Sequence, residues 1–323
     1  PDAPEVVAVE AAADAVADVV AAAAVVAVDR REAMNTVPKL GIGWRPELAR
    51  AIEQRSDIEF VEIVAENCSA SEPPQPLLAL HKRGVTVIPH GISLSLGSAE
   101  LPDRARLQRL NALAARFDSP FVSEHIAFVR GATLESGHLL PVPRTGDAAK
   151  VLIENISYAK EFLNVPLVLE NIAYLCEWHN SEMNEAEFVT SILEETDSQM
   201  LLDVANLLAN AVNHGFDAIN YLRNIPLDRI AYVHIAGGII KDGMYHDTHA
   251  HPVPFGVLEL LGELCRLRVP PMVMLERDDL FPNEVVLNRE LDAIKAAAGA
   301  PPSRQLHARS AMVDSRSARR QTR

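Results

Sequence analysis

Seven short apolar runs in this chain each end in a carboxylate or an imidazole, and this repetition restricts the fold more than any other feature. The runs are rich in β-branched residues and short enough for buried strands, and most precede a segment with helical periodicity. Strands that alternate with helices indicate parallel βαβ units. The runs are FVEIVAEN (Glu66), VTVIPH (His90), PFVSEH (Glu124 and His125), PLVLEN (Glu170), MLLDVAN (Asp203), IAYVH (His234) and PMVMLE (Glu276).

With a first strand at KLGIGWR, the pattern predicts eight strands and roughly eight helices, which fits a single-domain (β/α)8 TIM barrel. A doubly wound open sheet is the alternative, but no GxGxxG follows the first strand. We predict strands over 39–45, 58–67, 85–90, 121–128, 167–171, 200–206, 230–236 and 272–276. The connections near 131–144, 207–216 and 237–254 are predicted as loops.

Composition points to a globular domain between two unusual termini. The chain has 323 residues and a net charge of −14, although its last segment is basic, with six Arg and one Asp from residue 301 onward. We expect an Ala/Val-rich, dispensable extension over 1–36, the barrel over 37–299 and a basic, disordered tail over 300–323. An acidic body does not suit binding to nucleic acid, whose phosphates need Lys and Arg.

Cellular location follows from the cysteines and from the N-terminal segment. Cys68, Cys176 and Cys265 are odd in number and far apart, which indicates a reducing cytoplasm rather than a disulfide framework. The longest uncharged run of the first segment, residues 19–28, is too short to span a membrane, and no basic n-region precedes it. We therefore expect a cytoplasmic protein without a membrane segment.

The loop YHDTHAHP is the clearest indication of a metal site. It places His246, Asp247, His249 and His251 within six residues, so several ligands can reach one ion. An exposed polar loop without a metal is the alternative for this loop taken alone. His234, upstream on a strand end, favours the metal.

The residues at the other strand ends could likewise bind a metal or play a purely structural role. Glu170 is costly to bury unless it is paired or metal-bound, and a salt bridge to Arg45 or Arg277 is the structural alternative. A single strand histidine such as His90 is more often a hydrogen-bonded core residue than a ligand. Glu66 is the weakest member and is interpreted as a partner that holds a ligand imidazole.

Glu124 and His125 raise a geometric question, because adjacent residues on a regular strand point to opposite faces. Either one of them supports a ligand from behind, or a bulge turns both inward. Asn206, three residues after Asp203, can orient that carboxylate. His214, in the sequence NHG, is open to three interpretations: a ligand, a proton carrier or neither.

The number of candidates indicates more than one ion. One catalytic zinc needs about three protein ligands, whereas this chain offers eight or more, none of them a thiolate. Imidazoles with carboxylates suit Fe, Mn or Zn. The predicted metal ligands are His90, Glu124, His125, Glu170, Asp203, His234, Asp247, His249 and Glu276.

Ten motifs in order give the chain a family resemblance: GIGWR, AEN, PHGISLSLGS, VSEH, HLLPVP, LVLEN, LLDVAN, NHGFD, VHIAGG and DTHAHPV. They resemble those of the multinuclear non-haem iron-dependent oxidases, the family of MbnB and TglH. The resemblance covers roughly residues 40–279. It implies a TIM barrel with two or three irons (Fe²⁺/Fe³⁺) at its mouth, dioxygen as co-substrate, and the ligands given above, with either Glu124 or His125 from the fourth strand.

The resemblance also implies a substrate and a partner. Family members modify residues, commonly cysteine, in ribosomally made precursor peptides, and they usually act with a small protein that recognises the leader peptide. We assign catalytic roles to Glu124, His214 and Asn206. The chain departs from the commoner pattern at Gly238, at Ala205, at Arg277 and at His251, but these positions leave the nine ligands intact.

Two rival functions stand beside the peptide oxidase. One is a divalent-metal isomerase or hydrolase on the same barrel, similar to xylose isomerase or to an abasic-site endonuclease. The other is a scaffold that binds metal or peptide without turnover.

Overall fold

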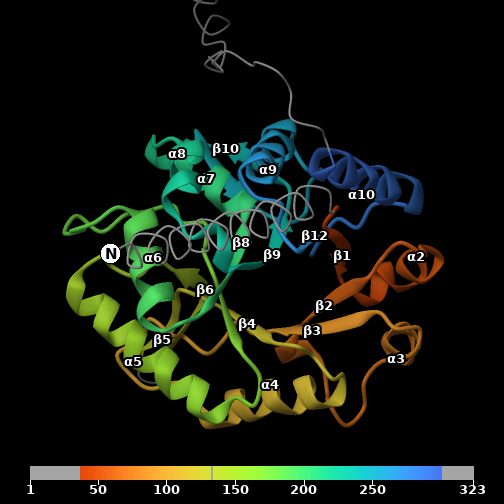
Figure 1. Ribbon diagram of the computed structural model, residues 1–323, viewed down its shortest axis with the longest axis horizontal. Helices are drawn as coiled ribbons and strands as arrows, with labels where there is room; N and C mark the ends of the chain where they lie inside the picture. Colours follow the sequence, from red (N-terminus) through yellow and green to blue (C-terminus); the bar gives the residue numbers. More distant parts are fainter. Residues whose placement is uncertain (1–36, 132–133, 300–323) are drawn as a thin grey trace, which may run out of the picture.

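The computed structural model describes residues 37–131 and 134–299, in which eight parallel strands close into a barrel. The strand order is β1-β12-β9-β8-β7-β4-β3-β2, and helices surround the barrel (Figure 1). This confirms the predicted TIM barrel. The barrel strands are β1 (Lys39–Gly43), β2 (Phe60–Val64), β3 (Thr86–His90), β4 (Val122–His125), β7 (Leu167–Glu170), β8 (Gln199–Asp203), β9 (Ile230–Ile235) and β12 (Met272–Leu275). The predicted segments 1–36 and 300–323 lie outside the described residues.

Six of the described α-helices begin at a short polar residue whose side chain caps them. Asp103, Thr145 and Asn283 each accept a hydrogen bond from a backbone N–H of the first turn, and Asn184 forms a capping box with Glu187. The described residues form nine α-helices. They are α2 (Ala49–Gln54), α3 (Gln75–Lys82), α4 (Arg104–Arg116), α5 (Gly146–Phe162), α6 (Glu185–Glu195), α7 (Val204–His214), α8 (Ala218–Asn224), α9 (Phe255–Leu267) and α10 (Glu284–Ala298), with short 3-10 turns η1 (Pro46–Leu48), η2 (Ala65–Asn67) and η3 (Leu227–Arg229). None of these helices is long and apolar enough to cross a membrane.

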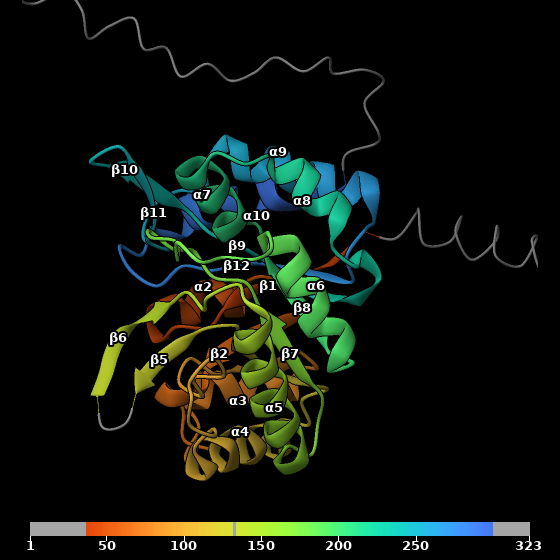
Figure 2. The same cartoon turned by 90° about the vertical axis from the view of Figure 1, so that its left-hand side faces the viewer.

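Two connections predicted as loops contain antiparallel hairpins. They are β5 (Phe128–Gly131) with β6 (Leu134–Leu140), and β10 (Gly238–Lys241) with β11 (Met244–Asp247). Both project from the same side of the barrel (Figure 2). Asp242 and Gly243 have φ values of 53° and 81°, as a two-residue type I′ turn requires. The Asp-Gly pair between two apolar stretches was a hairpin signal that the loop prediction overlooked.

The predicted sixth strand was too long, and the loop predicted after it is a helix. Strand β8 ends at Asp203, whose side chain accepts a hydrogen bond from the Asn206 N–H and so begins α7 at once. The helix ends at Gly215, which adopts the left-handed conformation at φ 74°. Asp203 therefore ends a strand and caps a helix at the mouth of the barrel.

Side chains alternate between two cores along each barrel strand. One set faces the helices and forms the large outer core, including Ile42, Val61 and Leu202. The other set fills the barrel interior with one compact apolar cluster: Phe60, Ile88, Phe121, Val168, Leu201, Ala231, Tyr232 and Met274. Gly41 of β1 leaves room for this filling, because a Cβ there would lie 2.4 Å from the Phe60 ring.

Candidate metal centre

A layer of polar side chains lies directly above the apolar filling of the barrel. Side chains two residues apart on a strand share a face, so each inward apolar residue is followed, two positions later, by the next inward residue. Phe60 is thus followed by Glu62, Ile88 by His90, Val168 by Glu170, Leu201 by Asp203, Tyr232 by His234 and Met274 by Glu276. All of these polar residues are buried.

Strand register brings the polar layer together. His125 is the Cα partner of Glu170 across β4 and β7, and Asp203 is the partner of His234 across β8 and β9. His125 Nε2 lies 3.1 Å from Glu170 Oε2, and the His90 and His125 rings are 4.6 Å apart. His234 Nδ1 lies 3.2 Å from Glu170 Oε1 and 3.1 Å from Glu276 Oε2.

Four overlapping groups of three ligand atoms result, with the atoms of each group within 4.8 Å of one another. Glu170 and Asp203 each belong to two groups, as do His234 and Glu276. The groups are His90, His125 and Glu170; Glu170, Asp203 and His234; Glu62, His234 and Glu276; and Asp203, His249 and Glu276. Shared carboxylates are the arrangement that bridges neighbouring cations.

Unpaired polar atoms at the centre of this cluster fit metal ions. Glu170 Oε2, Asp203 Oδ2, Asp247 Oδ1 and His234 Nδ1 are buried, and none makes a hydrogen bond of good geometry within the described chain. Buried polar groups are nearly always hydrogen-bonded, and an isolated buried carboxylate is costly. Glu170, Asp203 and His234 form one of the four groups, so a cation held there would satisfy three of these atoms. The residues therefore fit a metal centre of imidazole and carboxylate ligands.

The segment after β11 closes one side of the cluster. His249 contacts Asp247 through Nε2, and its Nδ1 lies 3.0 Å from Asp278 Oδ2 and 3.4 Å from Glu276 Oε1. His249 itself adopts the left-handed backbone at φ 50°, a strained position for a residue with a side chain. Gly237 lets this segment approach β9, because a Cβ there would lie 2.0 Å from the His251 carbonyl oxygen.

The titration behaviour of the cluster reflects burial opposed by charge. Burial alone would raise the pKa of Glu170, but the imidazoles of His125, His234 and His90 lower it to about 2. Burial alone would lower the pKa of His125, but Glu170 and Glu124 raise it to about 9. Burial, together with Asp247 and Glu170, raises the pKa of Asp203 well above its usual value. The site thus holds carboxylates that need positive charge, which protons or metal ions can supply.

The structure answers the question raised by Glu124 and His125. His125 continues the inward face after Phe121 and Ser123, and it lies in the cluster. Glu124 points away: Oε2 accepts from the N–H groups of Ser93 and Leu94, at 3.0 and 2.8 Å, and Oε1 accepts from the N–H of His125. Glu124 is outside all four groups. Besides these backbone contacts, its Oε1 lies 3.2 Å from His125 Nδ1, so Glu124 holds that imidazole from behind, and its role as a ligand stays a prediction.

A buried chain of hydrogen bonds fixes two of the imidazoles. His90 Nδ1 lies 2.9 Å from Ser123 Oγ, which lies 2.6 Å from the Tyr232 hydroxyl. That hydroxyl donates to Glu62 Oε2 at 2.6 Å, and His234 Nε2 lies 2.9 Å from the same oxygen. With a proton on His90 Nδ1 and on His234 Nε2, every bond in the chain has one donor. The opposite nitrogens, His90 Nε2 and His234 Nδ1, then present lone pairs to the cluster.

Glu62, Ser123 and Tyr232 were not predicted as site residues. The signal for Glu62 was present, because it follows the inward Phe60 by two residues within FVEIV. The prediction chose Glu66 instead, at the end of the apolar run. Glu66 holds no imidazole: it lies in η2, where its Oε1 accepts from the Ile92 N–H and the Ser93 hydroxyl.

Of the two other predicted catalytic residues, Asn206 lies beside the metal-ligand cluster and His214 does not. Asn206 is beside the cluster, where its N–H donates to Asp203 Oδ1 at 2.7 Å and its side chain donates to the Asn171 carbonyl. His214 is not among the residues brought together. It lies at the far end of α7, where it stacks on Tyr174 with ring centroids 4.5 Å apart.

The predicted salt-bridge alternatives are also resolved. Arg277 is buried but pairs with Glu290 at 2.6 Å, away from Glu170. Arg45 donates to Asp278 and lies 3.8 Å from Glu276 Oε1. Neither arginine pairs with Glu170, so the imidazoles provide the positive charge nearest to that carboxylate.

Comparison with known proteins shows the family to which this chain belongs. Residues 39–299 match the family described as RiPP precursor modification enzyme MbnB/TglH/ChrH. A UPF0276 protein of Streptomyces avermitilis is 50% identical over 273 residues, which is 82% of this chain and 56% of that protein. A UPF0276 protein of Caulobacter vibrioides is 37% identical over 80% of this chain and 94% of its own.

A buried cluster of imidazoles and carboxylates that could hold metal ions lies at the mouth of this TIM barrel. The chain belongs to the MbnB/TglH/ChrH family of enzymes that modify precursors of ribosomally synthesised, post-translationally modified peptides (RiPPs). It spans just over half the length of the Streptomyces avermitilis relative.

Solved structures support the fold. A D-psicose 3-epimerase of Clostridium cellulolyticum aligns with a TM-score of 0.54 at 13% identity, over 80% of this chain and 96% of that one. Endonuclease IV of Thermus thermophilus aligns with a TM-score of 0.53 at 18% identity, over 80% and 98%. At such identities the likeness concerns the barrel alone.

One departure from the commoner family motif has a structural reason. A Cβ on Gly238 would lie 2.3 Å from the His246 carbonyl oxygen and 2.5 Å from the Tyr245 ring. A residue with a side chain at this position would therefore clash within the β10–β11 hairpin as it folds in this chain.

Proposed function

We propose that this protein is an iron-dependent, dioxygen-using oxidase that modifies a residue, preferentially cysteine, of a ribosomally made precursor peptide. The observation that carries the proposal is the convergence of imidazoles and carboxylates in four overlapping groups, in which buried atoms of Glu170, Asp203 and His234 lack a hydrogen-bond partner among the described residues. Family membership supplies the substrate class. The cytoplasm is the proposed location, because the three cysteines are free.

Two or three irons would be held by the overlapping groups. His90, His125 and Glu170 would hold one, and Asp203, His249 and Glu276 another, while His234 with Glu170 and Asp203 would serve the position between them. Asp247 would support His249 through their contact. When bound, iron would supply the capacity to react with dioxygen that amino-acid side chains lack.

The protein's own part is to orient ligands, to exclude water and to admit the peptide from one side. Exposure of the cluster side chains increases from 0% at His234 to 20% at His249 and 38% at Asp278. The group that contains His249 is therefore the outermost. We infer that the peptide reaches the centre past His249 and Asp278, with a small leader-binding protein as its partner.

Metal loading and turnover test the proposal directly. The protein, reconstituted anaerobically with Fe²⁺, is expected to retain about two or three irons and to consume dioxygen with a Cys-containing peptide encoded beside its gene. Mass spectrometry should then show a changed peptide mass. Glu170→Gln removes a shared carboxylate oxygen and should lower iron content, whereas Glu161→Gln, an exposed acid on α5, should not.

Metal identity separates this proposal from the isomerase or hydrolase. Zinc or another divalent ion with no dioxygen uptake, and an unchanged peptide at full iron loading, would favour the rival class. An endonuclease function is further disfavoured by the net charge of −14, because a negatively charged protein repels the phosphates of nucleic acid.

A further inference from the structure

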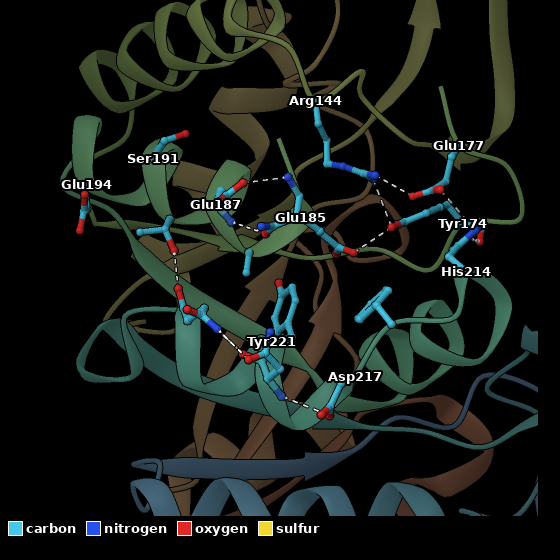
Figure 3. A pocket seen from close by; sticks show the side chains of 16 residues that line it. Arg144, Tyr174, Glu177, Glu185, Glu187, Ser191, Glu194, His214, Asp217 and Tyr221 are labelled. Atoms are coloured by element: carbon cyan, nitrogen blue, oxygen red, sulfur yellow. Dashed lines mark hydrogen bonds and ion pairs between the residues drawn. The ribbon is translucent and has the colours of Figure 1, made fainter. Parts of the chain in front are cut away.

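A cavity lies on the flank of the barrel mouth, separate from the metal-ligand cluster. Its volume is about 650 Å³, and it opens between α6, α8 and the connection that follows β7 (Figure 3). None of the nine predicted metal ligands lines it. His214, which the metal centre leaves unexplained, forms part of its wall.

The wall is acidic, and its single guanidinium is already engaged. Arg144 pairs with Glu177 at 2.6 Å and donates to the Tyr174 hydroxyl at 3.2 Å. The Tyr174 hydroxyl donates to Glu185 Oε2 at 2.9 Å, and no described residue donates to Glu185 Oε1. The acidic side chains that line the cavity are Glu177, Glu185, Glu187, Glu194 and Asp217.

An unpaired hydroxyl also faces this cavity. Tyr221 of α8 is 4% exposed, and its hydroxyl has no hydrogen-bond partner among the described residues. In Figure 3 its ring points toward Glu185. A buried phenol without a partner is uncommon and indicates that a polar ligand group completes its bonding.

We propose that this cavity binds the guanidinium group of an arginine side chain carried by the peptide on which the enzyme acts. The proposal rests on the proposed function for the identity of the ligand as a peptide. Carboxylates and flat aromatic rings together suit a guanidinium, which pairs with acids in its plane and stacks on rings with its faces. Arg144, 5.8 Å from the centroid of the Tyr174 ring, already makes this type of contact in the wall.

Position along the chain connects this cavity to the metal centre. Tyr174 follows the shared ligand Glu170 by four residues, and its N–H donates to Asn210 of α7, the helix that Asp203 caps. The connection that follows β7 therefore runs from the metal cluster, at Glu170, to the wall of the cavity, at Tyr174. Burial raises the pKa of Glu185 to about 7, and a neighbouring cation would favour its ionised form.

Calorimetric titration of the full-length protein with acetyl-Gly-Arg-Gly-amide tests the proposal. The citrulline peptide keeps the shape but lacks the charge, and it should bind at least tenfold more weakly. Glu185→Gln should weaken binding of the arginine peptide about tenfold or more. Tyr221→Phe removes one oxygen and should weaken it about three- to tenfold, as expected for one lost hydrogen bond. Glu195→Gln, the same change at an exposed position of α6, should leave the affinity unchanged.

Three results would overturn the proposal: equal binding of the two peptides, unchanged affinity in both Glu185→Gln and Tyr221→Phe, or tighter binding of free agmatine than of the arginine peptide. The last would assign the cavity to a small amine. The titration needs neither iron nor dioxygen. A failure here with an active iron-loaded enzyme would thus reject the cavity alone, and binding without turnover would reject the oxidase alone.

Discussion

The Tyr232 hydroxyl is the position at which the supporting role of the hydrogen-bond chain can be measured. Tyr232→Phe keeps the aromatic ring against Phe60 and Phe121 but removes the donor to Glu62. A hydrogen bond to a charged group is worth about 1.5–3 kcal/mol. Burial, and then the Glu62 carboxylate, raise the pKa of Tyr232 well above its usual value, so the phenol stays protonated and donates throughout the accessible pH range.

Two measurements follow from this reasoning. Urea unfolding of the metal-free protein should show a loss of about 2 kcal/mol, which for a domain of this size corresponds to a decrease in Tm of about 4–8 °C. Metal titration should show an affinity lower by about 10–100-fold, the usual effect of removing a group that orients ligands. Both losses are expected because the variant breaks the chain in the middle. Glu62 then contacts His234 without Tyr232, and Ser123 contacts His90 without Tyr232.

Tyr221→Phe is the matched control, because it also removes a buried hydroxyl but one without a partner. Its metal affinity should be unchanged and its stability should not decrease, because the hydroxyl that is removed makes no hydrogen bond among the described residues. The reasoning is that the hydrogen-bond chain from His90 to His234 orients these imidazoles for metal binding. An unaltered metal affinity in Tyr232→Phe, or an equal loss of stability in the two variants, would refute it.

Three further results are expected. Glu124→Gln places an amide against the backbone N–H groups of Ser93 and Leu94 and should cost about 2–4 kcal/mol in urea unfolding, so an unchanged midpoint would contradict its positioning role. Because the folded pKa of Glu185, about 7, exceeds the usual 4.5, its contribution to stability is complete below pH 4.5 and is lost as pH rises through 7. The free energy of unfolding should therefore fall less between pH 4.5 and pH 8 in Glu185→Gln than in the unchanged protein, by on the order of 1–3 kcal/mol. Anaerobic Fe²⁺ at 100 times its Kd should stabilise the protein by about 2.7 kcal/mol, and the absence of any Tm shift would argue against a metal centre.

Much of the fold could be predicted because its determinants are local. Apolar runs of strand length alternate with segments whose caps, such as Asn184 with Glu187 and Asp103, lie within a few residues of the helices they begin. The errors concern signals that were local but overlooked. The Asp242–Gly243 turn indicates a hairpin, and Asp203 marks the start of α7 as well as the end of β8.

The candidate site was predicted less completely. Strand-end position identified His90, Glu170, His234 and Glu276, but it chose Glu66 over Glu62 and did not separate Glu124 from His125. Counting in steps of two from the inward apolar residues would have corrected both choices, since Phe60 leads to Glu62 and Phe121 leads through Ser123 to His125. Which apolar residues face inward, however, becomes certain only when the barrel closes.

The sequence by itself determined a parallel barrel with imidazoles and carboxylates at the ends of its strands, because strand and helix periods and capping act over a few residues. Only the tertiary structure decided which atoms meet. Glu62 and His234 are 172 positions apart, and the cavity beside His214 joins segments from Arg144 to Asn224. Such contacts depend on strand register and on the direction of each side chain, which are fixed by packing between distant segments and leave no periodic mark in the chain.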